Sequence, residues 1–212
     1  MEKQEQLTLL TEIIESGYRL LTRKLAHVGL TARNESAFQL EYGHILKMLG
    51  QLYEFRLVDK FHLEFETWIP LTEKSLKSKS ARARVDLLVK YKDDDSEVKA
   101  AIELKFFKRE NHREPNNRYD VFQDIANLEL YKRHGIDLCY FILATDHAHY
   151  YNQESYSPDT GDFDFRHQST YVAGKPIQYK TPTPYGQDMS LQNTYTFLWN
   201  HIQDLYFLKL KV

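Results

Sequence analysis

The sequence predicts one α/β domain with a mixed central sheet flanked by helices. Apolar residues recur at helical spacing near the N-terminus and again in the middle of the chain, and four short runs have the character of strands. Because a helical segment separates the third of these runs from the fourth, the order α-α-β-β-β-α-β is that of an α/β domain. The chain has 212 residues, of which 42% are hydrophobic, and no repeat or long linker indicates a second domain.

Two helices are predicted at the start of the chain. Apolar residues follow helical spacing over residues 4–27 and again over residues 35–55. Asn34 or Ser36 is a candidate N-cap of the second helix, because a short polar side chain can accept a hydrogen bond from the first helical turn. The apolar positions of the two segments are Leu7, Leu10, Ile13, Ile14, Leu20 and Leu21, and Phe38, Leu40, Ile45, Leu46, Leu49 and Leu52.

Three strands are predicted next. Residues 61–69 alternate apolar and polar side chains and are followed by Pro70, which is typical of a half-buried strand. The apolar runs 85–89 and 100–106 are separated by the polar segment 92–96, which has the composition of a turn. We therefore expect these two runs to pair as a hairpin.

A helix and a further strand complete the predicted core. Residues 118–135 carry apolar side chains at helical spacing and end in His134-Gly135, a favoured helix C-cap, and residues 137–145 form an apolar run typical of a buried strand. In the Tyr-, Pro- and Thr-rich segment that follows, only a helix around residues 191–205 is predicted. The single domain, residues 1–212, is thus expected to consist of an N-terminal helix at about 4–27, a core at about 35–146 and a C-terminal extension at about 150–212.

Three charged residues lie within the two hairpin strands, where burial of charge is costly. Glu103 and Lys105 are two positions apart and share one face of a strand, and Asp86 can lie beside them on the neighbouring strand if the hairpin is in register. A buried, unpaired carboxylate costs several kcal/mol or stays protonated, and two adjacent carboxylates repel each other. Because Lys105 supplies only one compensating charge, the pattern indicates a divalent cation such as Mg²⁺, bound by carboxylates, water and substrate phosphate.

At these positions the sequence resembles the PD-(D/E)XK nuclease superfamily, which has the restriction-endonuclease-like fold. The resemblance rests on Asp86 in "RVDLLV" and on Glu103-Leu104-Lys105 in "IELK", set within an α-β-β-β-α-β order. Val85 stands where the family usually has proline. The resemblance implies a restriction-endonuclease-like core with a mixed sheet flanked by helices.

The resemblance also implies an activity, namely Mg²⁺- or Mn²⁺-dependent hydrolysis of phosphodiester bonds. We expect a DNA endonuclease that acts in restriction, defence or repair. Asp86, Glu103 and the backbone carbonyl of Leu104 would hold the metal ion, which polarises the phosphate and lowers the pKa of a bound water. Lys105 would orient that water or help to deprotonate it, and would stabilise the charge that develops on phosphorus.

Two helices often contribute further site residues in this family. Glu41 is the best match for an acidic metal ligand on the helix before the first strand, and Glu35 is a weaker match. On the helix after the lysine, Gln123 matches a polar residue that faces the site, with Asp124 and Asp120 as rivals.

Basic residues gather before and after the charged strands, although the net charge of the chain is −2. Because these segments enter and leave the strands of the candidate site, we expect them to contact the phosphates of nucleic acid, DNA in preference to RNA, and to supply salt-dependent affinity. The alternative is a solvated surface loop. The predicted contacts are Lys74, Lys77, Lys79, Arg82, Arg84, Lys108 and Arg109, with Arg113 and Arg118 farther along the second segment.

Alternatives to the nuclease stay open. Glu103 and Lys105 could form an exposed ion pair on an edge strand, and the same fold could serve as a non-catalytic module that binds nucleic acid or protein. His147 and His149, with Asp146, have the residue types of a zinc site, but alternate residues at a strand end more often bond to their neighbours. Several tyrosines could stack on bases, but we expect them to pack within the extension: Tyr150, Tyr151, Tyr156 and Tyr171.

The location predicted for the protein is the cytoplasm. The lone Cys139 lies in an apolar run and is expected to be a core residue, which suits a reducing compartment. No apolar stretch approaches the roughly 18 residues of a membrane span, and the N-terminus is acidic and amphipathic. The sequence leaves open whether the protein forms a homodimer.

Overall fold

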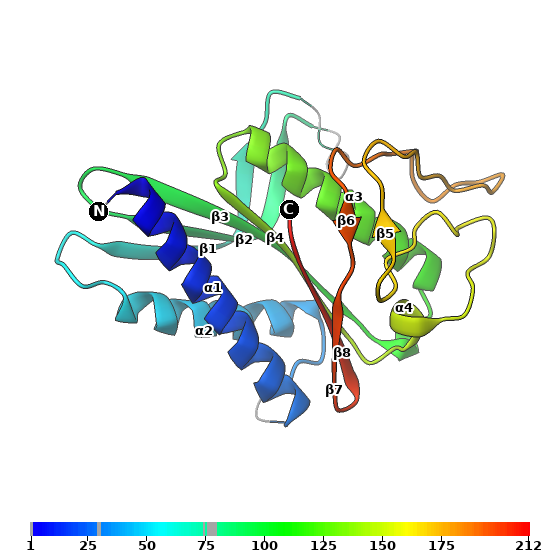
Figure 1. The fold of residues 1–212 in the computed structure, drawn as a ribbon, viewed down its shortest axis with the longest axis horizontal. Coiled ribbons are helices and arrows are strands. Elements are labelled where there is room, and N and C mark those ends of the chain that lie inside the picture. Colours follow the sequence, from blue (N-terminus) through cyan, green and yellow to red (C-terminus); the bar gives the residue numbers. More distant parts are fainter. Residues whose placement is uncertain (1, 29–30, 74, 76–79) are drawn as a thin grey trace.

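A six-stranded mixed sheet lies at the centre of the computed structural model, which describes residues 2–28, 31–73, 75 and 80–212 (Figure 1). The strand order is β1-β2-β3-β4-β8-β7, in which β3 and β4 are parallel and the other neighbours are antiparallel. Its strands are β1 (Lys60–Pro70), β2 (Arg82–Lys92), β3 (Glu97–Phe107), β4 (Leu138–Thr145), β7 (Trp199–Ile202) and β8 (Leu205–Lys211). A separate pair joins β5 (Thr170–Tyr171) to β6 (Tyr195–Thr196).

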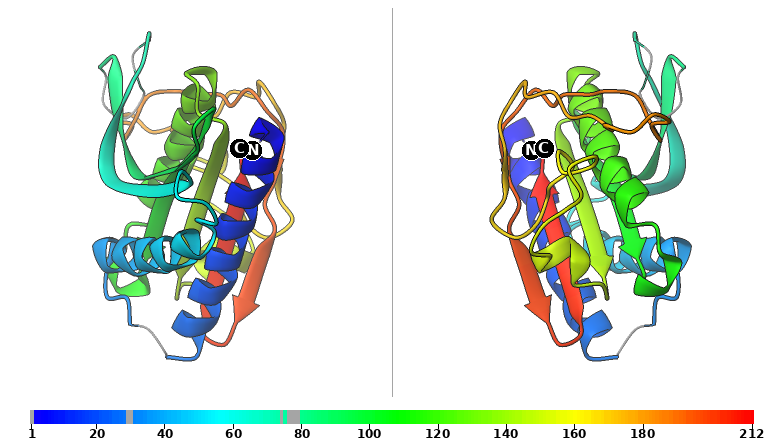
Figure 2. Two further views of the ribbon diagram at one scale, coloured as in Figure 1. Left: turned by 90° about the vertical axis from the view of Figure 1, so that its left-hand side faces the viewer. Right: turned by 90° about the vertical axis from the view of Figure 1, so that its right-hand side faces the viewer.

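Helices cover both faces of the sheet (Figure 2). One apolar core lies between the sheet and α1 and α2, and the other lies between the sheet, α3 and the segments after β4. The helices are α1 (Lys3–Ala26), α2 (Glu35–Leu52), α3 (Glu114–Arg133) and the short α4 (His149–Asn152), with a 3₁₀ turn at Arg109–Asn111. None of the helices within the described ranges is long and apolar enough to cross a membrane.

The local signals in the sequence account for the ends of these helices. Asn34 caps α2, as predicted, because its Oδ1 accepts a hydrogen bond of 2.8 Å from the Ala37 amide. Helix α3 begins at Glu114, earlier than predicted, with Pro115 in its first turn, where proline is tolerated. It ends before Gly135, whose φ of 86° confirms the predicted glycine C-cap.

The hairpin of β2 and β3 is confirmed, but it separates at Asp86. Its ladder runs from Lys92 opposite Glu97 to Leu87 opposite Ile102, and before Leu87 the strand β2 stays paired with β1 alone. The alternation of faces also shifts here, since Val85 packs in the α3 core whereas Leu87 packs in the α1–α2 core. The paired ends of β1 and β2 curve away from the rest of the sheet (Figure 2), and Asp86 is the first residue of β2 beyond the ladder with β3.

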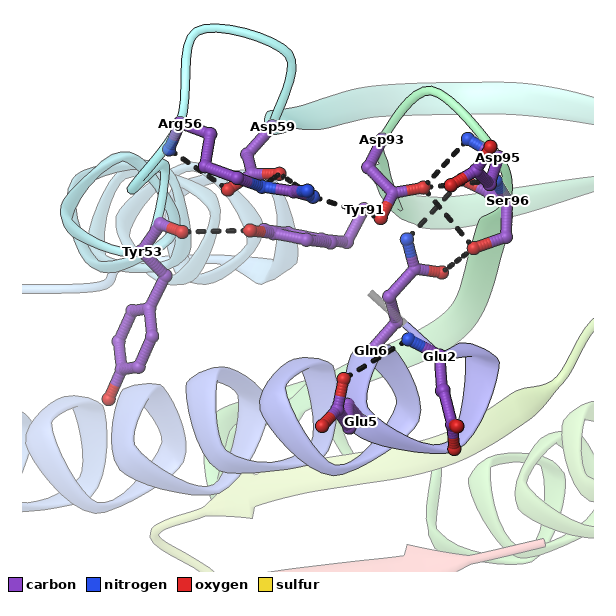
Figure 3. A network of polar contacts seen from close by, with 10 residues as sticks. All are labelled: Glu2, Glu5, Gln6, Tyr53, Arg56, Asp59, Tyr91, Asp93, Asp95 and Ser96. Carbon is purple, nitrogen blue, oxygen red and sulfur yellow. Dashed lines mark hydrogen bonds and ion pairs between the residues drawn. The ribbon is translucent and has the colours of Figure 1, made fainter.

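The turn of the same hairpin is held by a network of buried charge (Figure 3). The guanidinium of Arg56 lies 2.6 Å from Asp59 Oδ1 and 3.0 Å from Asp93 Oδ2, and each carboxylate side chain is only 1% exposed. Asp93 Oδ1 also accepts hydrogen bonds of 3.0 Å from the amides of Asp95 and Ser96. This group of Arg56, Asp59 and Asp93, here called the Arg56 cluster, fixes the turn against the loop after α2.

The C-terminal segment differs from the prediction in its secondary structure. The helix predicted around residues 191–205 is wrong, because Tyr195, Phe197 and Trp199 are buried and alternate with exposed residues, which is the period of a strand. The sheet also extends past residue 146, because β8 pairs with β4 inside it. The expected packing of the tyrosines is confirmed for Tyr150 and Tyr171, which are buried in the α3 core.

Candidate functional site

Glu103 and Lys105 share the face of β3 that is turned toward α3. Glu103 is fully buried, and its Oε1 accepts a hydrogen bond of 3.1 Å from the Tyr131 hydroxyl. Lys105 Nζ lies 2.9 Å from Asp124 Oδ2, and the lysine side chain is 11% exposed. Because alternate residues of a strand face opposite sides, the intervening Leu104 packs against α1 and α2. The structure therefore confirms the shared face, and the pair does not lie on an edge strand.

Asp86 reaches across from β2 to the same segment of β3. Its Oδ2 accepts a hydrogen bond of 2.6 Å from the amide of Leu104. The ladder between β2 and β3 ends at the pair Leu87–Ile102, and Asp86 is the next residue of β2 beyond this pair. Its carboxylate therefore bonds to an amide of β3 that lies outside the ladder. Asp86 is thereby held beside the backbone that joins Glu103 to Lys105.

Helix α2 approaches this group with Glu35 and Gln39, not with Glu41. Glu35 Oε1 lies 3.5 Å from Lys105 Nζ, and Gln39 Nε2 donates a hydrogen bond of 2.6 Å to the Asp86 carbonyl. The two residues are four apart and so share one face of the helix. Glu41 lines another hollow, between α1 and α2, with Lys24 and Met48. The structure thus places the second choice for the acidic helix residue, Glu35, beside Lys105.

Helix α3 contributes Asp124, with Asp120 one turn earlier. Asp124 contacts Lys105 directly, whereas the Gln123 amide bonds to the Tyr119 phenol. Burial raises the pKa of Asp120, and the neighbouring carboxylate of Asp124 raises it further. Of the three candidates on this helix, Asp124 is the one that contacts Lys105, as we expected of the polar residue that faces the site.

The charged side chains around Lys105 form one electrostatic group, here called the Lys105 cluster: Glu35, Asp86, Glu103, Lys105, Asp120 and Asp124. Burial raises the pKa of Glu35; Lys105 opposes this shift, whereas Asp86 and Asp124 add to it. Mutual repulsion between these carboxylates makes a proton or a cation favourable in the cluster.

A cleft of about 400 Å³ leads from the surface to this cluster. Lys105, Glu35 and Asp120 line it together with residues of the loops after β3 and before α2. Its cationic lining residues are Arg33, Lys105, Lys108 and Arg113. Three carboxylates line the same cleft, Glu35, Glu110 and Asp120, so that its wall mixes cationic and anionic side chains.

The residues predicted to contact nucleic acid occupy different positions. Lys74, Lys77 and Lys79 lie outside the described residues. On the curved part of β2, the Arg82 guanidinium covers the half-exposed Trp68 ring at 4.5 Å, and Arg84 Nε lies 2.7 Å from Glu66 Oε2. Both arginines are exposed on the strand that leads to Asp86.

The second basic segment divides along its length. Lys108 lines the cleft and pairs with Glu110 at 2.6 Å, whereas Arg109 lines a separate hollow with His147 and His149. Arg118 is 2% exposed and stacks on Tyr156 at 3.7 Å. The part of the prediction that extended this surface to Arg118 is therefore wrong, because this arginine is used to anchor the C-terminal segment.

The histidines after β4 lie close together but apart from the Lys105 cluster. The rings of His147 and His149 are 5.4 Å apart, and burial lowers the pKa of His149 to about 4. Over the described ranges of the chain, no three or more His, Cys, Asp or Glu side chains are arranged to hold a metal ion. The carboxylates of the Lys105 cluster are among these side chains.

Sequence reasoning missed Gln39 and Tyr131, which hold Asp86 and Glu103 respectively. Gln39 was detectable as the residue one helical turn after Glu35, whereas nothing local marks Tyr131.

No protein-family model, curated protein or solved structure matches the chain.

Proposed function

We propose that the protein is a metal-dependent nuclease with a restriction-endonuclease-like core, and that it cuts DNA as an endonuclease. The observation that carries the proposal is the meeting of Asp86, Glu103 and Lys105 at the point where β2 separates from β3. A cleft that contains four cationic side chains reaches Lys105, where the phosphate of a substrate would be attacked. A role in restriction, defence or repair, and a cytoplasmic location, are parts of the same proposal.

The donor atoms present suit Mg²⁺ or Mn²⁺. Asp86, Glu103 and the Leu104 carbonyl supply hard oxygen donors, and they are joined by the hydrogen bond from the Leu104 amide to Asp86. Two carboxylates and a carbonyl leave coordination positions for water and phosphate, which is common for Mg²⁺, so a third acidic side chain is not required. When bound, the metal ion would polarise the phosphate and lower the pKa of a coordinated water.

Lys105 is placed to act on the reacting groups and not as a ligand, since a protonated amine has no lone pair to donate. Its Nζ contacts Asp124 at 2.9 Å, the Leu104 carbonyl at 3.3 Å and Glu35 at 3.5 Å. The contact with Glu35 is the longest, and Glu35 is also the more exposed of the two acidic partners. A water or phosphate oxygen can therefore replace Glu35 while Asp124 continues to hold the lysine.

Two buried partners position the carboxylates. Tyr131 donates its hydroxyl proton to Glu103 Oε1, and Gln39 ties the Asp86 backbone to α2. Because these bonds are made before substrate enters, little reorganisation is needed when charge develops on the phosphate. The arrangement supports catalysis, whereas a module that only binds nucleic acid would not require buried carboxylates below its basic surface.

The test is cleavage by the purified protein of supercoiled plasmid, linear duplex, single-stranded DNA and RNA, with Mg²⁺, with Mn²⁺ and with EDTA. We expect internal cuts in DNA that depend on the metal ion. Asp86→Asn serves as the inactive control against contaminating nucleases. Binding without cleavage under all conditions would favour the non-catalytic module, and absence of both would refute the proposal.

A further inference from the structure

Loop 178–188 brings an exposed tyrosine, Tyr185, to the edge of the candidate site. The loop is closed by paired hydrogen bonds between Ile177 and Met189, and the Gln178 amide donates to Asp188 Oδ2 at 2.6 Å. Within this loop, the residue Tyr185 is 47% exposed. Most aromatic residues of the C-terminal segment are buried, so an exposed ring held at this place is unusual for the region.

Hydrogen bonds on both sides of Tyr185 in the sequence fasten the loop to α3. Tyr179 donates its hydroxyl proton to Asn116 Oδ1 at 3.0 Å, and Tyr119 donates to the Gln187 carbonyl at 3.2 Å. Gly186 lies against the Tyr119 ring so closely that an added Cβ would be 2.1 Å from its Cζ. The glycine is therefore required for this close approach, which fixes the position of the neighbouring Tyr185.

Tyr185 also contacts two residues that line the cleft. Arg113 Nη2 donates a hydrogen bond of 3.4 Å to its hydroxyl, and the hydroxyl bonds in turn to Asp120. Arg113 and Asp120 line the cleft with Lys105. The ring meets both Tyr119 and Tyr179 edge-to-face, with centroids 5.5 and 6.2 Å from its own, and nearly half of the residue stays in contact with solvent.

We propose that Tyr185 is a substrate-binding residue that stacks on a nucleobase beside the phosphate to be cut, so that the preferred substrate carries an unpaired base at that position. The inference rests on the proposed nuclease function and specifies its substrate class as single-stranded or locally unpaired nucleic acid. A base within a continuous duplex is stacked on its neighbours and does not present a free face, whereas an unpaired base can stack on an aromatic side chain. Arg113, beside the ring, is placed to contact the adjoining phosphate.

The experiment measures binding in EDTA, where no cleavage interferes, by fluorescence anisotropy. The probes are a labelled DNA single strand, its continuous duplex, the same duplex with one unpaired nucleotide, and the matching RNA strand. Wild-type protein is expected to bind the probes with an unpaired base more tightly than the continuous duplex. Tyr185→Ala should weaken binding to these probes by about 5- to 150-fold and leave duplex binding nearly unchanged, since base–aromatic stacking is a local interaction.

Three further variants separate stacking from a structural effect. Tyr185→Phe retains the ring and should retain the preference, and Gly186→Ala should lose it although Tyr185 is present, because the loop can no longer approach Tyr119. Val172→Ala, at an exposed site of the same segment, should behave as wild type. Equal binding of unpaired probes by wild type and Tyr185→Ala would overturn this inference alone. If wild-type protein bound none of the probes, the proposed function would fail with it.

Discussion

The β2–β3 hairpin carries buried charge at both of its ends, and the two groups are built differently. At the turn, the Arg56 cluster places a guanidinium between two nearly buried carboxylates, and its hydrogen bond to Asp59 lowers the pKa of that carboxyl. At the open end, the Lys105 cluster groups five carboxyl side chains around one lysine. There, burial raises the pKa of Glu35 and Asp120.

The difference indicates which group was built for stability. A lowered carboxyl pKa means that the folded state favours the charged form, so the Arg56 cluster stabilises the fold at neutral pH. A raised carboxyl pKa means that charge is retained in the folded state at a cost, which is typical of a functional site.

Lys105→Ala is expected to lower the rate of DNA cleavage by about 10²–10³-fold, the range found when one electrostatic donor is removed from an active site. Binding of Mn²⁺, measured by calorimetry, should be largely retained because the lysine is not a ligand. The matched control is Lys90→Ala, which removes a lysine of β2 that pairs with Glu64. Cleavage by Lys105→Ala at the wild-type rate would remove the lysine from the proposed mechanism.

Divalent metal is expected to stabilise the wild type by about 2.7 kcal/mol at a hundredfold excess over Kd, whereas Asp86→Asn should respond far less. In EDTA this variant should be as stable as wild type or more so, because the asparagine oxygen can still accept from the Leu104 amide while the repulsion is reduced. Thermal melts with EDTA and with Mg²⁺ or Mn²⁺ measure both effects.

The Arg56 cluster provides the opposite pattern as a control. Asp59→Asn should lower the melting temperature in EDTA, since it weakens the pairing with Arg56, and should keep the full response to metal. If Asp86 were instead a structural partner of Lys105, Asp86→Asn would lower the free energy of unfolding by roughly 3–5 kcal/mol. In that case metal would stabilise neither this variant nor the wild type. Such a result would contradict the metal site.

Asp59→Asn in the Arg56 cluster and Asp120→Asn in the Lys105 cluster should change the pH dependence of the free energy of unfolding in opposite directions. The folded-state pKa of Asp59 is lowered, so its contribution is present above the unfolded pKa of about 4 and is lost as the pH falls through the folded value. Because Asp120 has a raised folded-state pKa, its contribution is present below about pH 4 and is lost as the pH rises through the folded value.

Relative to wild type, Asp59→Asn should therefore be least stable near neutral pH, and Asp120→Asn should gain stability as the pH rises from 4 to 7. Urea unfolding in EDTA at a series of pH values gives both differences. Parallel curves for Asp120→Asn and wild type would show that this carboxyl titrates normally and would weaken the contrast between the clusters.

Glu35→Gln should change the cleavage rate only a few-fold, the smallest effect expected, because Glu35 makes the longest contact with Lys105 and can be replaced by substrate. Glu41→Gln should leave the rate unchanged, since this residue lines the hollow between α1 and α2. Rates measured at saturating Mg²⁺ compare the two variants. A larger loss in Glu41→Gln than in Glu35→Gln would restore Glu41 as the acidic helix residue of the site.

The sequence by itself determined the features that depend on backbone periodicity. The period of a strand places Glu103 and Lys105 on one face whatever surrounds them, and the turn-forming residues 92–96 make a hairpin of the strands on either side. Asn34 and Gly135 mark helix ends because capping is a local interaction. The placement of Glu103 and Lys105 on one face of a hairpin strand was therefore predictable.

Tertiary structure decided which distant residues complete the site. Helical spacing allows Glu35 or Glu41, and only the rotation of α2 on the sheet directs Glu35 toward Lys105. The bond from Leu104 to Asp86 depends on where the hairpin opens, which follows from packing of the curved strands against α3. Loop 178–188 reaches α3 through contacts between residues more than sixty positions apart, such as Tyr179 with Asn116. Local patterns carry no information about such contacts, because they form only when the two cores pack.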